Sequence, residues 1–210
     1  MPLYKIINFN TSTQILVWKI SESFEQLLNE VELNEKSLNR LNGMKSQIHQ
    51  RGFLSVRKLL QEVGYTDFDL FYDEFGKPHL KGEKHISITH SHGFSAIILS
   101  NKTVGIDIEI RREKIKIIAD KFVDQEFNYL NKSNSDDYIS KLTIIWGVKE
   151  SVFKIRNEPG ISFKDHIMVR KFEINDKQSI AKLHFMNFKK EFKIYFEELE
   201  DYTLVYAFEN

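Results

Sequence analysis

The fold is decided by the stretch WGVKESVFK, residues Trp146 to Lys154. It lies in a proline-free run from Asp136 to Glu158 that is long enough for several helical turns. Apolar side chains recur there at three- and four-residue steps, which predicts a helix with one face on the core: Ile145, Val148, Val152 and Ile155. Glu150 and Lys154 follow Trp146 at four-residue steps, so these three form a neighbouring stripe. Taken alone, such an acid–base pair is most often a surface ion pair of about 0.2–0.5 kcal/mol.

A second acidic pair lies upstream in a predicted strand. Apolar and other residues alternate from Val104 to Arg111, which is typical of a half-buried strand. Asp107 and Glu109 share its polar side about 7 Å apart, where like charges repel, and aspartate is a poor strand former. Either this side faces water, or a cation lies between the two carboxylates.

The remaining pattern predicts an α+β protein whose halves each place helical segments before strands. Helical patterns cover Ser23 to about Leu60, with a helix start indicated at Asn34-Glu35-Lys36. A second helical pattern covers Ile115 to Leu130, with Glu126 available on another side than the packed residues. The predicted strands are Ile15–Ile20, Phe68–Tyr72, Ile86–Ser91, Phe94–Ser100 and an antiparallel meander over 168–174, 181–188, 192–196 and 202–208. The expected domains are residues 1–103 and 104–210.

Composition excludes several functions. The 210 residues carry 30 basic and 30 acidic side chains, so binding to nucleic acid through net charge is not expected. With no cysteine, the chain has no thiolate nucleophile, disulfide or sulfur-bound zinc. The sequence contains no apolar run of transmembrane length, and its first ten residues lack the features of a secretion signal. We therefore expect a cytoplasmic protein that binds no membrane.

Three carboxylates suggest a hard-cation site. If Asp107, Glu109 and Glu150 come together, their oxygens suit Mg²⁺, with Mn²⁺ as an alternative, better than zinc. Magnesium keeps several waters and is often completed by substrate phosphates, so a phosphate-bearing substrate is expected. Lys154 or Lys149 could neutralise a phosphate oxygen, and His90, late in its predicted strand, could donate to another.

The order of three motifs resembles the 4′-phosphopantetheinyl transferases, specifically the long, two-domain type that activates surfactin synthetase. The first motif is Gly76-Lys77-Pro78 followed by Ser87-Ile88-Thr89-His90-Ser91, the second is Val104 to Glu109, and the third is Trp146 to Lys154. Each is weak alone, whereas all three in this order and spacing are specific. The similarity runs from about Lys45 to Phe163, including Phe122-Val123 and Glu126.

The resemblance implies a catalytic site in the second half. Asp107, Glu109 and Glu150 would hold Mg²⁺ against the pyrophosphate of coenzyme A (CoA). Glu150 would take the proton of the attacking serine, directly or through water, and Lys154 would contact the pyrophosphate. The acceptor would be an apo acyl- or peptidyl-carrier protein, modified with release of 3′,5′-ADP.

The resemblance also implies CoA contacts in the first half. His90 would bind the 3′-phosphate, shared with Arg57 and less directly with Arg51 or Lys45. Thr89, Gly76 and Lys77 would lie near the adenine and ribose. The resemblance further implies a monomer. Its two subdomains would be related by a pseudo-twofold axis, with CoA in the cleft between them.

The chain departs from the family's pattern at three places. Thr89 stands where serine is common, Ser151 replaces a common alanine, and residues 157–161 replace a glycine-containing turn. Two other functions are weighed against the transferase. One is a non-catalytic module that binds CoA or a carrier protein. The other is a metal-dependent nuclease, although such sites usually place the last acid and the lysine two residues apart on a strand.

Overall fold

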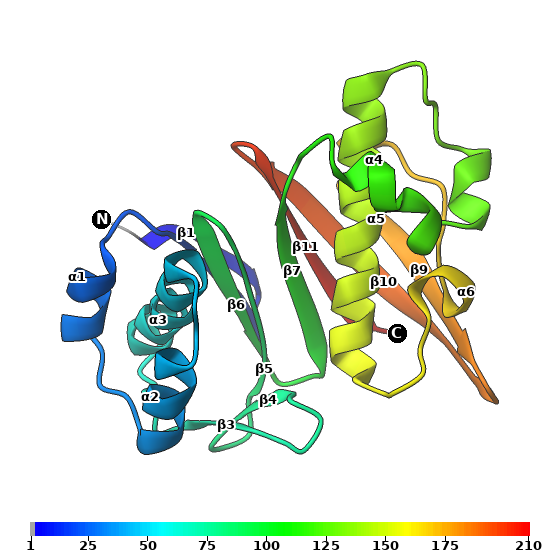
Figure 1. Cartoon of the computed structure of the whole chain (residues 1–210). Helices are drawn as coiled ribbons and strands as arrows, with labels where there is room; N and C mark the ends of the chain where they lie inside the picture. The colour runs from blue at the N-terminus through cyan, green and yellow to red at the C-terminus, as the bar shows by residue number, and fades with distance from the viewer. Residues whose placement is uncertain (1–2) are drawn as a thin grey trace. The chain divides into compact units, whose positions relative to one another are not determined.

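The computed structural model describes residues 3–210. The chain divides into two compact units, Met1–Lys102 and Thr103–Asn210. Each unit contains an antiparallel sheet with a long helix against it, so the predicted α+β class is confirmed (Figure 1). The pseudo-twofold relation between the units stays a prediction.

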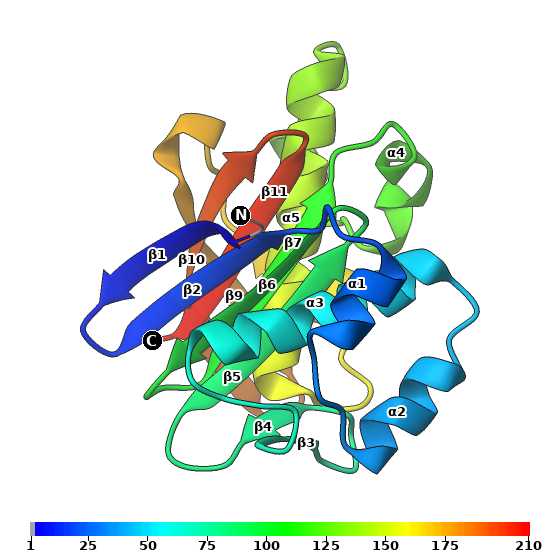
Figure 2. The ribbon, with the colours of Figure 1, turned by 90° about the vertical axis from the view of Figure 1, so that its left-hand side faces the viewer.

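The first unit is built on a four-stranded sheet of order β1-β2-β6-β5. Its strands are β1 (Leu3–Asn10), β2 (Thr13–Lys19), β5 (His85–Ser91) and β6 (Phe94–Ser100). Helix α3 (Gln47–Glu62) lies along one face of this sheet, as Figure 2 shows, and packs on β2, β5 and β6. A separate two-stranded ladder joins β3 (Leu70–Tyr72) to β4 (Pro78–Leu80). Strand β1 was not predicted.

The helical segment expected over 23–60 is three helices: α1 (Phe24–Asn29), α2 (Glu35–Asn42) and α3. Ser23 caps α1 through the Gln26 amide, and Asn34 caps α2 through the Ser37 amide, so each side chain opens a new helix. The helical prediction is confirmed with breaks, and a helix opens at Asn34 as predicted, because these polar residues satisfy backbone donors that a helix start leaves open.

The second unit is built on a five-stranded antiparallel sheet of order β7-β11-β10-β9-β8. Its strands are β7 (Val104–Ile110), β8 (Ile167–Val169), β9 (Gln178–Phe185), β10 (Phe188–Leu199) and β11 (Tyr202–Glu209). The meander is therefore confirmed with shifted bounds. Helix α5 (Ser135–Arg156) crosses one face and packs mainly on β7 and β11 (Figure 1). The predicted apolar stripe of α5 is buried in the core of this unit.

The region expected to be a helix over 115–130 is broken into short turns. It contains α4 (Ile115–Ile118), η1 (Ala119–Lys121) and η2 (Gln125–Asn128), and the remaining short elements are α6 (Phe163–His166) and η3 (Ile174–Asp176). Glu126, expected on another side than the packed residues, is 1% exposed. The Glu126 carboxylate is instead buried, where Oε1 lies 2.9 Å from Lys149 Nζ and accepts from the Val169 amide at 2.9 Å.

Strand β7 also differs from its predicted half-buried state. Its first five residues are buried on both sides, and Asp107 is only 4% exposed. The interpretation that this acid faces water is wrong.

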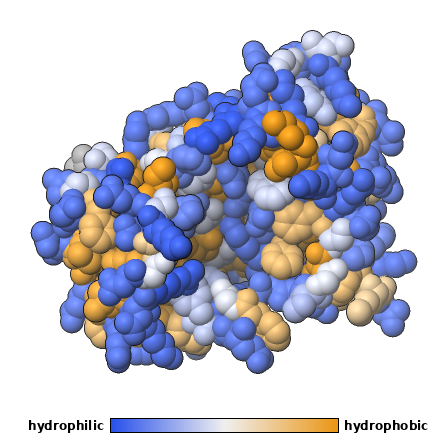
Figure 3. All heavy atoms as spheres, in the orientation of Figure 1, coloured by the Kyte–Doolittle hydropathy of each residue, from blue (hydrophilic) through white to orange (hydrophobic). Residues whose placement is uncertain are grey.

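The surface drawn in Figure 3 is mostly hydrophilic, with apolar residues in separate patches. Among residues 3–210, no helix is both long and apolar enough to span a bilayer.

Candidate functional site

Two glycines let α5 approach the sheet closely. A Cβ built on Gly105 would lie 1.9 Å from the Ser151 carbonyl oxygen, and one on Gly147 would lie 2.7 Å from Val205 Cγ2 and 3.6 Å from Asp107 Oδ2. Both motifs therefore carry glycine where the helix and the sheet are in close contact. These contacts also orient α5: its Ser151 turn lies over Gly105, and its Gly147 turn lies over Asp107.

We expect Gly105→Ala to lower the free energy of unfolding by about 1–3 kcal/mol or more, the usual cost of overpacking. The atom in the way is a backbone carbonyl, so relief requires moving α5. Chemical denaturation measures the change. Gly43→Ala is the control, because a Cβ there meets its nearest atoms at ordinary contact distances of 3.5 Å and 3.6 Å and the φ of −77° suits alanine. A Gly105→Ala variant as stable as wild type would show that α5 shifts freely.

The close approach brings Lys154 to Asp107. Lys154 Nζ lies 2.8 Å from Asp107 Oδ1 and donates to the Ile106 carbonyl oxygen, also at 2.8 Å. A charge pair between helix α5 and the edge strand β7 is thus formed across 47 residues of sequence. The pair is partly buried, so it is screened less than a surface pair.

Glu150 lies one turn before Lys154 and is electrostatically coupled to Asp107. Burial raises the pKa of the Glu150 carboxyl, the negative charge of Asp107 raises it further, and Lys154 opposes both. Two acids held close in a partly desolvated place are unfavourable unless a cation is shared between them. Lys154 already supplies one positive charge to Asp107.

Glu109 is the third predicted ligand. It is half-buried and lies on the same side of β7 as Asp107, two residues further on. Within residues 3–210, no three acidic or histidine side chains are grouped closely enough to hold a metal ion. The structure thus brings Asp107, Glu150 and Lys154 together and leaves Glu109 as their neighbour along the strand. Carboxylate oxygens of this kind fit Mg²⁺.

Lys149 is not part of this site. Its side chain is 0% exposed, and Nζ lies 2.9 Å from Glu126 Oε1 and 3.0 Å from the Phe163 carbonyl oxygen. The expectation that Lys149 could meet a phosphate is therefore wrong. Burial lowers the pKa of this ammonium, and the charge of Glu126 opposes that shift. Lys149 thus pairs with Glu126 inside the fold, whereas its neighbour Glu150 lies at the site with Asp107.

In the first unit the structure places His90 against α3. A Cβ on Gly52 would lie 2.8 Å from His90 Nδ1, and the ring of His49 is centred 6.3 Å from that of His90. His90 is exposed, and the adjacent half-buried Arg51 donates through Nη2 to the Ile20 carbonyl oxygen at 3.1 Å. Two imidazoles and a guanidinium therefore gather where α3 begins. His49 was not predicted, because nothing in the sequence relates it to His90.

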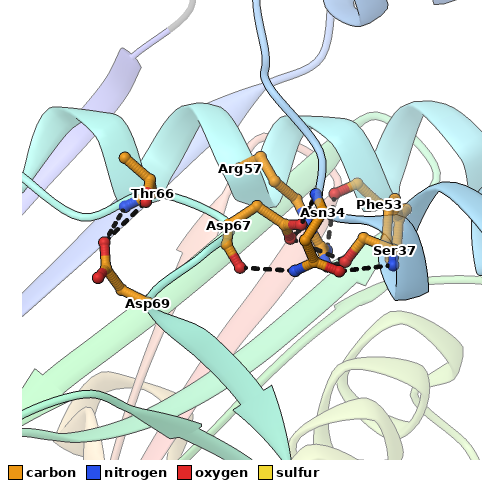
Figure 4. A network of polar contacts seen from close by, with 7 residues as sticks. All are labelled: Asn34, Ser37, Phe53, Arg57, Thr66, Asp67 and Asp69. Carbon is orange, nitrogen blue, oxygen red and sulfur yellow. Dashed lines mark hydrogen bonds and ion pairs between the residues drawn. The ribbon is translucent and has the colours of Figure 1, made fainter.

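Arg57 has a different environment, seen from close by in Figure 4. It is 3% exposed, its Nε lies 2.8 Å from Asp67 Oδ1, and its guanidinium stacks on Phe53 at 3.5 Å. Asp67 also accepts from the Asn34 amide and from Ser37 Oγ, each at 2.9 Å (Figure 4). This network ties the start of α2 to α3. The charge of Arg57 is thus neutralised by Asp67 inside the fold. Arg57 is therefore not among the proposed ligand contacts.

The loop carrying Gly76 and Lys77 is shaped by Asp73. Asp73 Oδ1 accepts from the amides of Phe75 at 3.0 Å and Lys77 at 2.9 Å, and Oδ2 lies 3.0 Å from His79 Nε2. Hydrogen bonds from His79 and then from the Lys77 amide lower the pKa of Asp73. Gly76 has φ +80°, a conformation that glycine adopts without strain.

The last two predicted residues lie elsewhere in the first unit. Thr89 is buried next to His90 in β5, and Lys45 is exposed in the connection between α2 and α3. They remain predicted contacts.

Comparison with known proteins finds the same family. Residues 103–207, half of the chain, match the model of the 4′-phosphopantetheinyl transferase superfamily. The curated 4′-phosphopantetheinyl transferase gsp of Aneurinibacillus migulanus is 30% identical over 152 residues. The match covers 70% of this chain and 62% of that relative's length.

Proposed function

Because the chain belongs to the 4′-phosphopantetheinyl transferase superfamily, we propose that it transfers 4′-phosphopantetheine from CoA to a serine of an apo acyl- or peptidyl-carrier protein. The observation that carries the proposal is the meeting of Asp107, Glu150 and Lys154 inside the matched region. Two coupled acids and a lysine at one place suit a reaction at a pyrophosphate. Membership of this family favours the transferase over the metal-dependent nuclease.

The second unit supplies the reacting groups. Asp107, Glu109 and Glu150 would hold Mg²⁺, which when bound neutralises charge on the pyrophosphate oxygens. Lys154 sits next to Asp107 and would donate to a pyrophosphate oxygen. Preorganised charges of this kind act where negative charge develops in the transition state.

Residues of the first unit would contact the rest of CoA. His90 and Arg51 would bind the 3′-phosphate as hydrogen-bond donors, with Lys45 as a further cation. Gly76, Lys77 and Thr89 would lie near the adenine and ribose. The rigid turn built by Asp73 supports this assignment, because a preorganised loop loses little entropy on binding.

In the reaction, the carrier serine Oγ attacks the β-phosphorus of CoA. A new O–P bond forms, the bond to the bridging pyrophosphate oxygen breaks, and 3′,5′-ADP leaves. Glu150 takes the serine proton, directly or through a water. The raised pKa of Glu150 suits this role, since a base works best when its pKa approaches the operating pH. The rest of the catalysis is alignment and charge neutralisation.

The test incubates the purified protein with CoA, Mg²⁺ and several apo acyl- and peptidyl-carrier proteins. We expect a carrier serine to gain phosphopantetheine in intact-mass spectra, 3′,5′-ADP to appear, and EDTA to stop both. CoA binding without modification of any carrier would instead favour a non-catalytic binding module. Carriers whose target serine is replaced by alanine control for modification elsewhere.

A further inference from the structure

Thr203, in β11, is a buried residue whose hydroxyl has no role within the fold. It is 1% exposed, and among residues 3–210 its Oγ1 has no hydrogen-bond partner. Leaving a buried hydroxyl unpaired costs about 1–3 kcal/mol. Valine would fill the same space without that cost, so packing alone does not explain a threonine here.

Other buried hydroxyls of this unit are satisfied. Thr143 Oγ1 donates to the Ile139 carbonyl oxygen at 2.8 Å, and Ser151 Oγ donates to the Val205 carbonyl oxygen at 3.3 Å. Thr203 differs from both, and such an exception calls for a partner from outside the chain or a neighbour that moves when a ligand binds.

The strand register places Thr203 directly opposite Glu109. Thr203 pairs with Glu109 and Val205 pairs with Asp107 in the antiparallel ladder of β11 and β7. Cross-strand partners point to the same face of the sheet. That face is the one covered by α5, because Val205 Cγ2 lies only 2.7 Å from where a Cβ on Gly147 would be. Thr203 therefore shares a face with Asp107 and Glu109.

The order of residues along this face shows on which side of the site Thr203 lies. Helix α5 runs opposite to β7, with Ser151 over Gly105 and Gly147 over Asp107. Moving along β7 from Asp107 to Glu109 thus follows α5 toward its N-terminus, the direction that leads from Lys154 to Glu150. Glu109 and Thr203 lie on the Glu150 side of the site.

We propose that Thr203 is a positioning residue for the cation site. When a cation binds, the Thr203 hydroxyl donates a hydrogen bond to the Glu109 carboxylate and holds that carboxylate turned toward the ion that Asp107 and Glu150 share. Cβ atoms of cross-strand partners lie about 4.5–5.5 Å apart, which is within reach of such a bond. The inference rests on the proposed function, since it needs a divalent cation at these acids.

The test compares Thr203→Val, Thr203→Ser and wild type by titration with Mn²⁺, followed by electron paramagnetic resonance, with and without CoA. Losing a residue that orients a metal ligand typically weakens metal affinity 10–100-fold, so we expect about a 10-fold loss for Thr203→Val. Thr203→Ser keeps the hydroxyl and should stay near wild type. Thr143→Val is the matched control, because its hydroxyl is satisfied within α5.

The melting temperature without metal is the second readout. Thr203→Val should melt at or above the wild-type temperature, because it removes an unpaired buried hydroxyl. Unchanged Mn²⁺ affinity in Thr203→Val, or a lowered melting temperature, would overturn the proposal. Wild type that binds Mn²⁺ but modifies no carrier would refute the transferase alone, whereas wild type that binds no Mn²⁺ would refute the cation site and the role of Thr203.

Discussion

Lys149→Met is expected to lower the free energy of unfolding by about 3–5 kcal/mol, the usual result of removing one partner of a buried ion pair. The variant leaves the Glu126 carboxylate without its cation in a place that is 1% exposed. Glu126 Oε1 would still accept from the Val169 amide at 2.9 Å, but an amide does not neutralise the charge. Urea denaturation measures the loss.

Lys141 offers the matched control on the same helix. It is also nearly buried, yet its partners Asp137 and Glu173 are 26% and 60% exposed. Water can solvate those acids after Lys141→Met, so we expect a loss of at most about 1 kcal/mol. A Lys149→Met variant no less stable than Lys141→Met would contradict the buried-pair argument.

The double variant Lys149→Met/Glu126→Gln separates charge from packing. It removes both charges while the glutamine oxygen can still accept from the Val169 amide. Neutral replacements of a buried pair are often as stable as the pair, so most of the loss should be recovered. No recovery would mean that the lysine stem, not its charge, holds α5 in place.

Local patterns predicted the regular elements well and their ends poorly. The apolar stripe of α5 and the alternation of β7 are properties of neighbouring residues, so sequence was sufficient for them. The start of α2 at Asn34 is a local capping signal, but the hydrogen bond from the Asn34 amide to Asp67, a residue 33 positions away, is not. Strand β1 is an edge strand with Tyr4 and Ile6 exposed, so it lacks a buried apolar pattern.

The candidate site was predicted as a set of residues but not as a geometry. Consecutive residues of a helix point about 100° apart, so Lys149 and Glu150 necessarily face different directions. Only the packing of α5 decides which of them meets Asp107 and which meets Glu126. Thr203 could not be singled out, because its relation to Glu109 is a matter of strand register across nearly the whole second unit.

Glu150→Gln is expected to reduce phosphopantetheine transfer by at least about 100-fold, the lower end of what a general base contributes. The amide cannot take the serine proton, and it is a poorer cation ligand than a carboxylate. Initial rates of carrier modification at saturating CoA measure the effect. Asp136→Asn is a control that removes one negative charge from the exposed first turn of the same helix.

The stability of Glu150→Gln distinguishes lost chemistry from a damaged fold. Burial and Asp107 raise the pKa of Glu150, so the folded state without metal disfavours the ionised carboxylate. Such a group destabilises the fold progressively as the pH rises from the ordinary glutamate pKa through the raised one. A neutral amide of the same shape removes that penalty, so Glu150→Gln should melt at or above the wild-type temperature at neutral pH without metal. Near-normal transfer would refute the role of Glu150, whereas lost transfer together with a lower melting temperature would mean that the carboxylate supports the fold instead.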